Sequence, residues 1–282
     1  MGGLGNQLHG IAAGVTISGY LRLPVQFDAQ QIPYGSNPKR VLMVDQLDLG
    51  INNFVFKRSK FSPIIGRLLF ATNRLGLPMG HLVKGVEPDW IDNESGPENQ
   101  LPLIPSRGVI AGHFLDFQWA EKAFLNGMNL RGLKRPLGLG ALEIAREMTP
   151  KSIAIHARFG DYKKNLKSFP LLDLHFYQRA LEKFDNVSDR WIFTDDIRSA
   201  GKILGDKFVS KSKLIPLARI SDVEAFFLLS RFNQIVTSNS TFSSWAAFFA
   251  DKNQKARIVT PTPHMFGNWK DNLPNEWIRV EI

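Results

Sequence analysis

The sequence predicts an α/β protein built around parallel β-sheet. In its second half, short apolar runs alternate with amphipathic helical patterns, which is typical of βαβ units. Three of these runs, at residues 152–157, 191–193 and 235–236, end abruptly in polar clusters. Because the carboxyl ends of parallel strands meet at one edge of a sheet, we expect the three clusters to form a ligand-binding edge.

The connections between these runs support the same fold class. After residue 170, apolar side chains recur at helical spacing. Ser221 and Glu224 form a capping-box pattern that opens a second apolar helix. A third helix is expected through Trp245 and Phe249, and residues 257–259 are expected as the last strand.

The first half begins with the glycine-rich stretch 2–7, which is expected as a turn that leads into a helix ending near Leu21. A short apolar run at residues 23–27 follows. The order resembles a dinucleotide fingerprint, but Leu8 stands where close packing requires a small residue. A nicotinamide cofactor is therefore disfavoured.

Periodicity is weak from about residue 30 to 105, and residues 108–112 are expected as a buried strand. Aromatic side chains then surround His113 and Gln118, a pattern that suits either a sugar platform or an aromatic corner of the core. Residues 129–138 combine Gly, Pro and basic side chains and are the best candidate for a linker. We therefore expect two lobes, residues 1–135 and 136–282.

Composition narrows the function classes. The chain has no cysteine, which excludes disulfides, thiolate metal sites and a cysteine nucleophile. No apolar run is long enough to span a bilayer and no signal-peptide pattern is present, so a cytoplasmic protein is expected. The net charge is +9, with a basic excess in both halves. This spread indicates an anionic small ligand or an anionic membrane face rather than a nucleic-acid groove.

The three polar clusters suit a purine nucleoside diphosphate. Arg158 offers bidentate donation to phosphate oxygens. Ser240 and Thr241 begin a helix, where amides and the helix dipole favour an anion. Asp195 or Asp196 would accept hydrogen bonds from the N1–H and amino group of guanine. Such a site requires no metal.

Each cluster also has a purely structural interpretation. Arg158 and Asp161 would form an ion pair that locks the turn. Asp195–Asp196 and Ser240–Thr241 would be helix caps. His156 would be a core histidine whose hydrogen bonds are satisfied.

Five stretches, taken in order, resemble the bacterial α-1,2-fucosyltransferases of glycosyltransferase family 11. They are Gly2-Gly3-Leu4-Gly5-Asn6-Gln7, Gly112-His113-Phe114 with Gln118, His156-x-Arg158-x-Gly160-Asp161-Tyr162, Phe193-Thr194-Asp195-Asp196 and Ser238-Asn239-Ser240-Thr241-Phe242. The resemblance extends over nearly the whole chain, and the ordered combination is more specific than any one stretch.

The resemblance implies a GT-B-like fold, with two Rossmann-like lobes whose parallel sheets face each other across a cleft. It implies inverting transfer of L-fucose from GDP-β-L-fucose to the 2-hydroxyl of a galactose-type residue in a glycan or polysaccharide. It implies no metal and no other cofactor. The N-terminal lobe would bind the acceptor, and the C-terminal lobe would bind the nucleotide sugar.

Residue roles follow from the same resemblance. Arg158 would stabilise the leaving diphosphate, and no residue is assigned as general base or metal ligand. The acceptor side would use His113, Asp116 and Gln118. The donor-binding residues would be Gly3, Gly5, Asn6, His156, Arg158, Asp161, Asp195, Asp196, Asn239, Ser240 and Thr241.

Two departures keep alternatives open. Many members carry a second Arg where this chain has Phe159, so less positive charge is expected to face the donor. The chain begins at the glycine stretch, without the strand expected before it as the first of the N-terminal lobe, so two alternatives are open: the start is trimmed, or this lobe lacks an edge of its sheet. The alternatives are a non-catalytic nucleotide-sugar-binding protein on the same fold and a fucosyltransferase of different linkage.

The expected partners are a nucleotide sugar and a glycan acceptor, with a lipid-linked glycan as one option, and no nucleic acid is expected. The absence of an anchor is consistent with a bacterial-type soluble form. With the basic balance of the chain, it suggests a cytoplasmic protein that contacts the anionic inner face of the plasma membrane.

Overall fold

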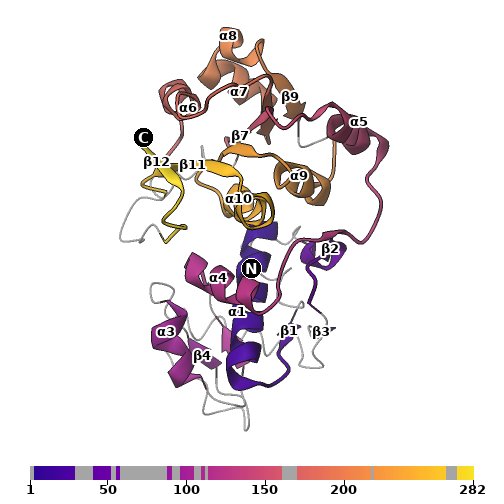
Figure 1. The fold of residues 1–282 in the computed structure, drawn as a ribbon, viewed down its shortest axis with the longest axis vertical. Helices are drawn as coiled ribbons and strands as arrows, with labels where there is room; N and C mark the ends of the chain where they lie inside the picture. The colour runs from indigo at the N-terminus through magenta and orange to yellow at the C-terminus, as the bar shows by residue number, and fades with distance from the viewer. Residues whose placement is uncertain are drawn as a thin grey trace. The chain divides into compact units, whose positions relative to one another are not determined.

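The computed structural model describes residues 3–28, 41–51, 55–57, 88–90, 96–104, 109–111, 114–160, 170–216, 219–264 and 272–282. The chain divides into two compact units, residues 1–129 and 130–282, which are described separately below (Figure 1). The lobe boundary expected near residue 135, and the roles expected for the two lobes, stay predictions.

The N-terminal unit is built on helix α1, Leu4–Leu21, which packs along α4, Phe117–Leu125. The buried Thr16 hydroxyl donates to the carbonyl of Trp119 at 3.0 Å and ties the two helices together. Two short parallel strand pairs, β1 with β3 and β4 with β5, belong to the same unit. The other elements are short: β1 Gln26–Asp28, η2 Val44–Gln46, β2 Leu47–Asp48, β3 Val55–Lys57, β4 Pro88–Trp90, α3 Pro97–Gln100, η4 Leu101–Leu103 and β5 Val109–Ala111.

The C-terminal unit contains a six-stranded parallel sheet in the order β12-β11-β10-β7-β8-β9. The parallel sheet predicted from the alternating pattern is therefore confirmed. Its strands are β7 Ile153–Ala157, β8 Arg190–Thr194, β9 Lys213–Pro216, β10 Gln234–Val236, β11 Arg257–Thr262 and β12 Ile278–Glu281, and the short β6, Gly132–Leu133, precedes them.

Helices cover both faces of this sheet (Figure 1). They are α5 Leu139–Glu147, α6 Leu174–Leu181, α7 Ile197–Leu204, α8 Asp206–Val209, α9 Asp222–Leu229 and α10 Thr241–Gln254. Successive side chains of a strand point to opposite faces. Ile153 and Ile155 therefore enter the core formed with α6, α7 and α8, whereas His156 faces α10, where its ring stacks on Phe242.

The strand order reverses beside β7. The chain runs from β7 to β8 and β9 on one side, then returns to place β10 on the other side of β7. This position is a topological switch point, and in open parallel sheets the carboxyl ends of the strands at such a point form the ligand-binding crevice. The polar residues after β7 and β10 lie at this edge.

Several elements differ from expectation. Helix α1 begins at Leu4 with Gly3 at its N-cap, so Gly5 belongs to the first helical turn rather than to a loop. The strand at Arg257–Thr262 is not the last, because β12 follows it, and β9 was not anticipated either. The capping box of Ser221 and Glu224 is confirmed in both directions.

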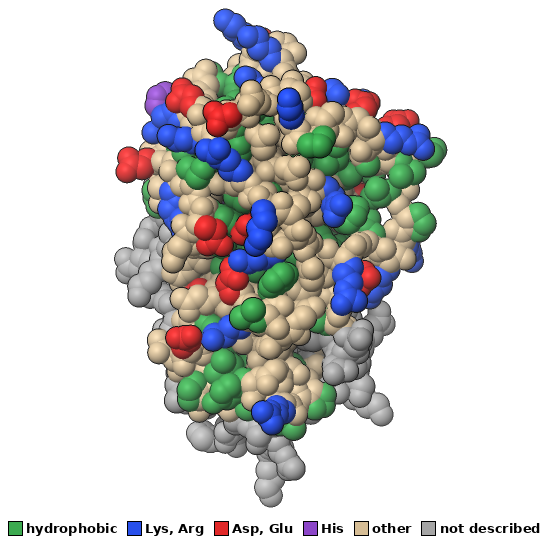
Figure 2. All heavy atoms as spheres, in the orientation of Figure 1, with side chains coloured by type: hydrophobic (Ala, Val, Ile, Leu, Met, Phe, Trp, Pro, Cys, Tyr) green, Lys and Arg blue, Asp and Glu red, His purple; other side chains and the backbone are tan. Residues whose placement is uncertain are grey.

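The surface carries the basic excess in dispersed form. Lys and Arg side chains are scattered among Asp and Glu over the face drawn in Figure 2. Within the described parts of the chain, no helix combines the length and apolar character that a membrane span requires.

Candidate functional site

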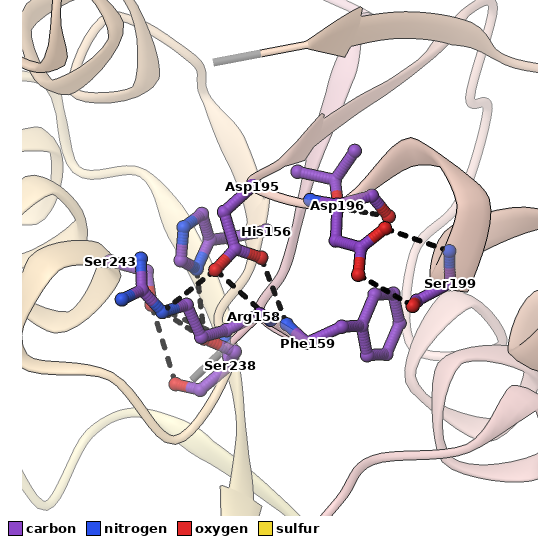
Figure 3. Close-up of polar contacts among 10 residues, drawn as sticks. His156, Arg158, Phe159, Asp195, Asp196, Ser199, Ser238 and Ser243 are labelled. Atoms are coloured by element: carbon purple, nitrogen blue, oxygen red, sulfur yellow. Dashed lines mark hydrogen bonds and ion pairs between the residues drawn. The ribbon is translucent and has the colours of Figure 1, made fainter. Parts of the chain in front are cut away.

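The turn after β7 is organised by Asp195, which follows β8. One carboxylate oxygen accepts the backbone N–H of Phe159 at 2.9 Å, and the other accepts that of Gly160 at 3.1 Å. The Nε of Arg158 lies 3.2 Å from Oδ2 of the same carboxylate (Figure 3). With 28% of its side chain exposed, Arg158 is held in position yet accessible to a ligand.

Gly160 is required by this arrangement. A Cβ at this position would lie 2.7 Å from Oδ2 of Asp195, closer than a carbon and an oxygen can approach. The absence of a side chain therefore lets the carboxylate reach the backbone of the turn.

Asp196 has a different task. Its carboxylate caps α7, because Oδ1 accepts the N–H of Ser199 at 3.1 Å and Oδ2 accepts the hydroxyl of Ser199 at 2.7 Å (Figure 3). The helix-cap interpretation of this residue is thus confirmed. The two adjacent carboxylates do not act as a pair: Asp195 positions the turn, and Asp196 starts a helix.

Phe159 does not face the polar site. Its side chain is fully buried in the core beside α6 and α7, together with Leu172 and Phe176, and it points away from Arg158 (Figure 3). In this protein the side chain at position 159 therefore packs in the core, whereas the sequence suggested that it determines how much charge faces the donor.

His156 is almost completely buried, with 1% of its surface exposed. Nδ1 lies 2.8 Å from the Ser238 hydroxyl, and the ring stacks on Phe242 with centroids 5.4 Å apart. Burial, and then the charge of Arg158, lower the pKa of His156 to about 3, so the ring is neutral at physiological pH. The backbone carbonyl of His156 accepts a hydrogen bond from the hydroxyl of Tyr177 at 3.1 Å.

The segment between β10 and α10 supplies uncharged polar groups. The Ser243 hydroxyl accepts the N–H of Ser238 at 3.2 Å and folds the segment back on the helix start. The amide of Asn239 donates to the carbonyl of Pro170 at 2.7 Å. Ser240 is the N-cap of α10, but its side chain makes no capping hydrogen bond. The helix start expected at Ser240 and Thr241 is therefore present, and the Ser240 hydroxyl does not cap it.

The predicted residues of the N-terminal unit lie in two places within that unit. Gly3, Gly5 and Asn6 form the start of α1. Asp116 is the N-cap of α4, where it accepts the N–H of Gln118 at 2.8 Å, and burial raises its pKa.

Close approach of the backbone also shapes the start of α4. A Cβ on Gly96 would lie 2.3 Å from Oε1 of Gln118.

His113 and Asp161 are outside the described residues, and the ligand roles of all the predicted site residues stay predictions.

Within the C-terminal unit, one sheet edge therefore combines an arginine with a partly exposed side chain, a neutral histidine and a helix N-terminus. Such a set can hold the oxygens of a phosphorylated ligand through charge, hydrogen bonds and the helix dipole. Sequence reasoning missed Tyr177, whose hydroxyl holds the His156 backbone, and Ser243, which folds the segment before α10. A serine three residues past an N-cap serine was the available signal for the latter.

Two curated proteins from Escherichia coli are similar to this chain. One, named alpha-1,2-colitosyltransferase, is 28% identical over 184 residues, which are 60% of this chain and 62% of that protein. The other, named O-antigen biosynthesis glycosyltransferase WbnK, is 26% identical over 137 residues, 45% of this chain and 44% of that protein. The matched segments thus span less than two thirds of either relative.

Comparison with solved structures identifies the fold. Fucosyltransferase NodZ from Bradyrhizobium matches with a TM-score of 0.51 and 14% sequence identity, over 94% of each chain. The similarity confirms the expected α/β, GT-B-like fold class. Residues 130–281, which contain the whole six-stranded sheet and its polar edge, match the model of glycosyl transferase family 11. The chain therefore belongs to glycosyl transferase family 11.

Proposed function

We propose that this protein is an inverting glycosyltransferase that moves L-fucose from GDP-β-L-fucose to the 2-hydroxyl of a galactose-type residue. One observation carries the proposal. Arg158, fixed on Asp195, and the N-terminus of α10 follow the two neighbouring strands β7 and β10 at the switch point of the sheet. A cation and a helix start at one such edge suit a diphosphate.

The names of the similar proteins support the class of reaction. The first curated relative is named for a 1,2 linkage, which agrees with transfer to a 2-hydroxyl. The structural neighbour is a fucosyltransferase. The same relative favours a second candidate, transfer of a colitosyl group, since its name specifies that sugar.

In the proposed reaction, the acceptor hydroxyl attacks the anomeric carbon from the side opposite to GDP. The bond from that carbon to the diphosphate oxygen breaks, and negative charge grows on the diphosphate. Arg158 and the start of α10 would stabilise this charge as fixed donors, which is usually the largest electrostatic contribution to such catalysis. We propose that no metal participates, so transfer should be unchanged by an excess of chelator.

Calorimetric titration with GDP tests the binding site, and release of GDP from GDP-fucose in the presence of galactosides tests transfer. Wild-type protein is expected to bind GDP. It is also expected to release GDP from GDP-fucose only when the acceptor is present. Protein that binds GDP without turnover would instead be a nucleotide-sugar-binding protein. Absence of GDP binding would reject both functions, and faster turnover with a nucleotide-linked colitose would favour the second candidate.

The Arg158→Ala substitution is the sharpest test of the mechanism. Loss of one preorganised donor is expected to lower the transfer rate by about 10²–10³-fold. Arg257→Ala is the matched control, because Arg257 begins β11 at the opposite end of the strands and pairs with Asp185 at 3.7 Å. Near-normal transfer by Arg158→Ala would reject the assignment.

We further propose a glycan acceptor that is lipid-linked, with the protein bound at an anionic membrane surface. The net charge of +9 supports this proposal. Co-sedimentation should be stronger with vesicles that contain anionic lipid than with neutral vesicles, and it should weaken as salt is added. Equal sedimentation with both would contradict membrane binding by charge.

A further inference from the structure

His156 has one ring nitrogen in use and one that is not. Nδ1 is 2.8 Å from the Ser238 hydroxyl, while Nε2 is buried and has no hydrogen-bond partner among the described residues. Phe242 covers the ring by stacking. A buried polar atom without a partner is costly, so Nε2 marks a position where a ligand would supply the missing hydrogen bond.

Because the ring is neutral, only one nitrogen carries a proton, and the neighbouring hydroxyls determine which. The Ser243 hydroxyl lies 3.2 Å from the carbonyl of Ser240 and 3.3 Å from that of Ser238, so its own proton has a carbonyl acceptor. It is 3.4 Å from the Ser238 hydroxyl, a long distance for an O–H donor.

The other hydroxyl proton to be placed is that of Ser238. The shortest contact of the Ser238 hydroxyl oxygen with an acceptor is the 2.8 Å separation from Nδ1 of His156. With the Ser238 hydroxyl as the donor of this contact, Nδ1 is the acceptor and the ring proton lies on Nε2. The hydrogen bonds around one ring nitrogen thus set the state of the other.

We propose that Ser238 and Ser243 are positioning residues that fix His156 in the Nε2–H tautomer and so present a neutral N–H donor to an oxygen of the bound ligand. Ser243 orients Ser238 by accepting its backbone N–H, and Ser238 orients the ring. That this ligand is a nucleoside diphosphate sugar rests on the proposed function. A neutral donor avoids a second positive charge two residues from Arg158.

Nitrogen NMR of protein labelled with ¹⁵N-histidine tests the tautomer directly, with His156→Gln used to assign the signal. The free wild-type protein is expected to show Nε2 protonated and Nδ1 unprotonated. Ser238→Ala removes the donor to Nδ1 and should give a mixture of tautomers, whereas Ser238→Thr keeps a hydroxyl and should restore the wild-type signature. A protonated Nδ1 in the wild type, or an unchanged tautomer in Ser238→Ala, would overturn the proposal.

Thr237→Val is the matched control. Thr237 is the neighbouring buried residue, and its hydroxyl donates to Thr260 at 3.0 Å rather than to the histidine. Its substitution should leave the His156 signal unchanged. A shift of that signal as large as the one in Ser238→Ala would show that general loosening of the segment is responsible, which would also overturn the proposal.

GDP titration separates this inference from the proposed function. In the wild type, GDP should shift the Nε2 signal of His156, and Ser238→Ala and Ser243→Ala should weaken GDP binding by about fivefold, the effect of one hydrogen bond. GDP binding that leaves the Nε2 signal unchanged would overturn the donor role. Absence of GDP binding would overturn the proposed function and the proposed contact between Nε2 and the ligand. The tautomer would still be determined by NMR of the free protein.

Discussion

The two strand ends that flank the switch point differ in how they are positioned. After β7 and β8, a charged pair fixes the site: Asp195 holds Arg158 and two backbone amides of the turn. After β10, uncharged groups do this work, with Ser243 and Asn239 making hydrogen bonds to backbone groups. In the proposed function, the first end would supply positive charge to the ligand, and the second would supply hydrogen-bond donors of fixed orientation.

This difference predicts which substitutions should affect stability and ligand binding together. At the charged end Asp195 alone holds both the turn and Arg158, so its substitution should weaken folding and ligand binding together. After β10, several side chains share these roles, so a single substitution should affect either stability or ligand binding without the other. The four predictions below test this contrast, beginning with the largest expected effect.

Asp195→Ala should have the largest effect on folding. It removes the acceptor of two backbone N–H groups and the partner of Arg158, and an unfolding free energy lower by about 3 kcal/mol is expected. Denaturant unfolding measures the loss, and calorimetry should show much weaker GDP binding. Asp173→Ala is the matched control: Asp173 caps α6, where its Oδ1 accepts the N–H of Phe176 at 3.0 Å, and loss of this cap should cost about 1 kcal/mol with GDP affinity retained. Equal effects of both substitutions on GDP binding would contradict the contrast.

Gly160→Ala tests the close approach at the charged end. The added Cβ would lie 2.7 Å from Oδ2 of Asp195, whose position is fixed by three contacts, so a loss of about 2 kcal/mol is expected from overpacking. Gly140→Ala provides the comparison, because the nearest atom there is 3.8 Å away, and its unfolding midpoint should not fall. A Gly160→Ala protein as stable as the wild type would show that the carboxylate can move aside.

His156 should make folding sensitive to pH. Its pKa is about 3 in the folded protein, against an ordinary 6.5, so between these values the unfolded chain binds more protons. Stability from this group is fully present above pH 6.5 and falls as the pH is lowered, by about 1 kcal/mol between pH 7 and 5.5. The unfolding free energy of wild type should therefore decrease more steeply over this interval than that of His156→Gln. Parallel pH profiles would contradict the low pKa.

Ser240→Ala should have the smallest effect on folding. Its side chain makes no capping hydrogen bond, so the unfolding free energy should change by less than about 0.5 kcal/mol, while GDP affinity falls about fivefold. Ser221→Ala removes a hydroxyl that does cap a helix and should show the opposite result, a loss of about 1 kcal/mol without weaker GDP binding. A Ser240→Ala protein that is destabilised but binds GDP normally would identify an ordinary cap.

The sheet of the C-terminal unit could be predicted because its strands are apolar and end at abrupt polar clusters. The capping box of Ser221 and Glu224 could be predicted because its hydrogen bonds connect residues close in sequence. Strands β9 and β12 were missed because their residues, such as Arg279, mix polar with apolar side chains. Their pairing depends on neighbouring strands in the sheet, which a local pattern does not record.

The residues of the candidate site could be predicted from the sequence, but the separate structural role of each could not. Asp195 and Asp196 are identical in type and adjacent, and only the three-dimensional positions of Gly160 and Ser199 give them different tasks. Phe159 was expected to lower the positive charge of the site because many members of the family carry a second Arg at this position. Its burial follows from the core formed by α6 and α7, which sequence spacing does not reveal.

The pairing of β7 with β10 has a consequence for synthesis of the chain. His156 and Ser238, which meet in the site, are separated by 82 positions in sequence. A growing chain therefore exposes β7, β8 and β9 to solvent before β10 can take its place beside β7, and contacts of such long range form slowly. The proposed nucleotide ligand cannot assist the early steps, since the residues that would bind it have not yet come together. Bound ligand would instead slow the unfolding of the finished unit.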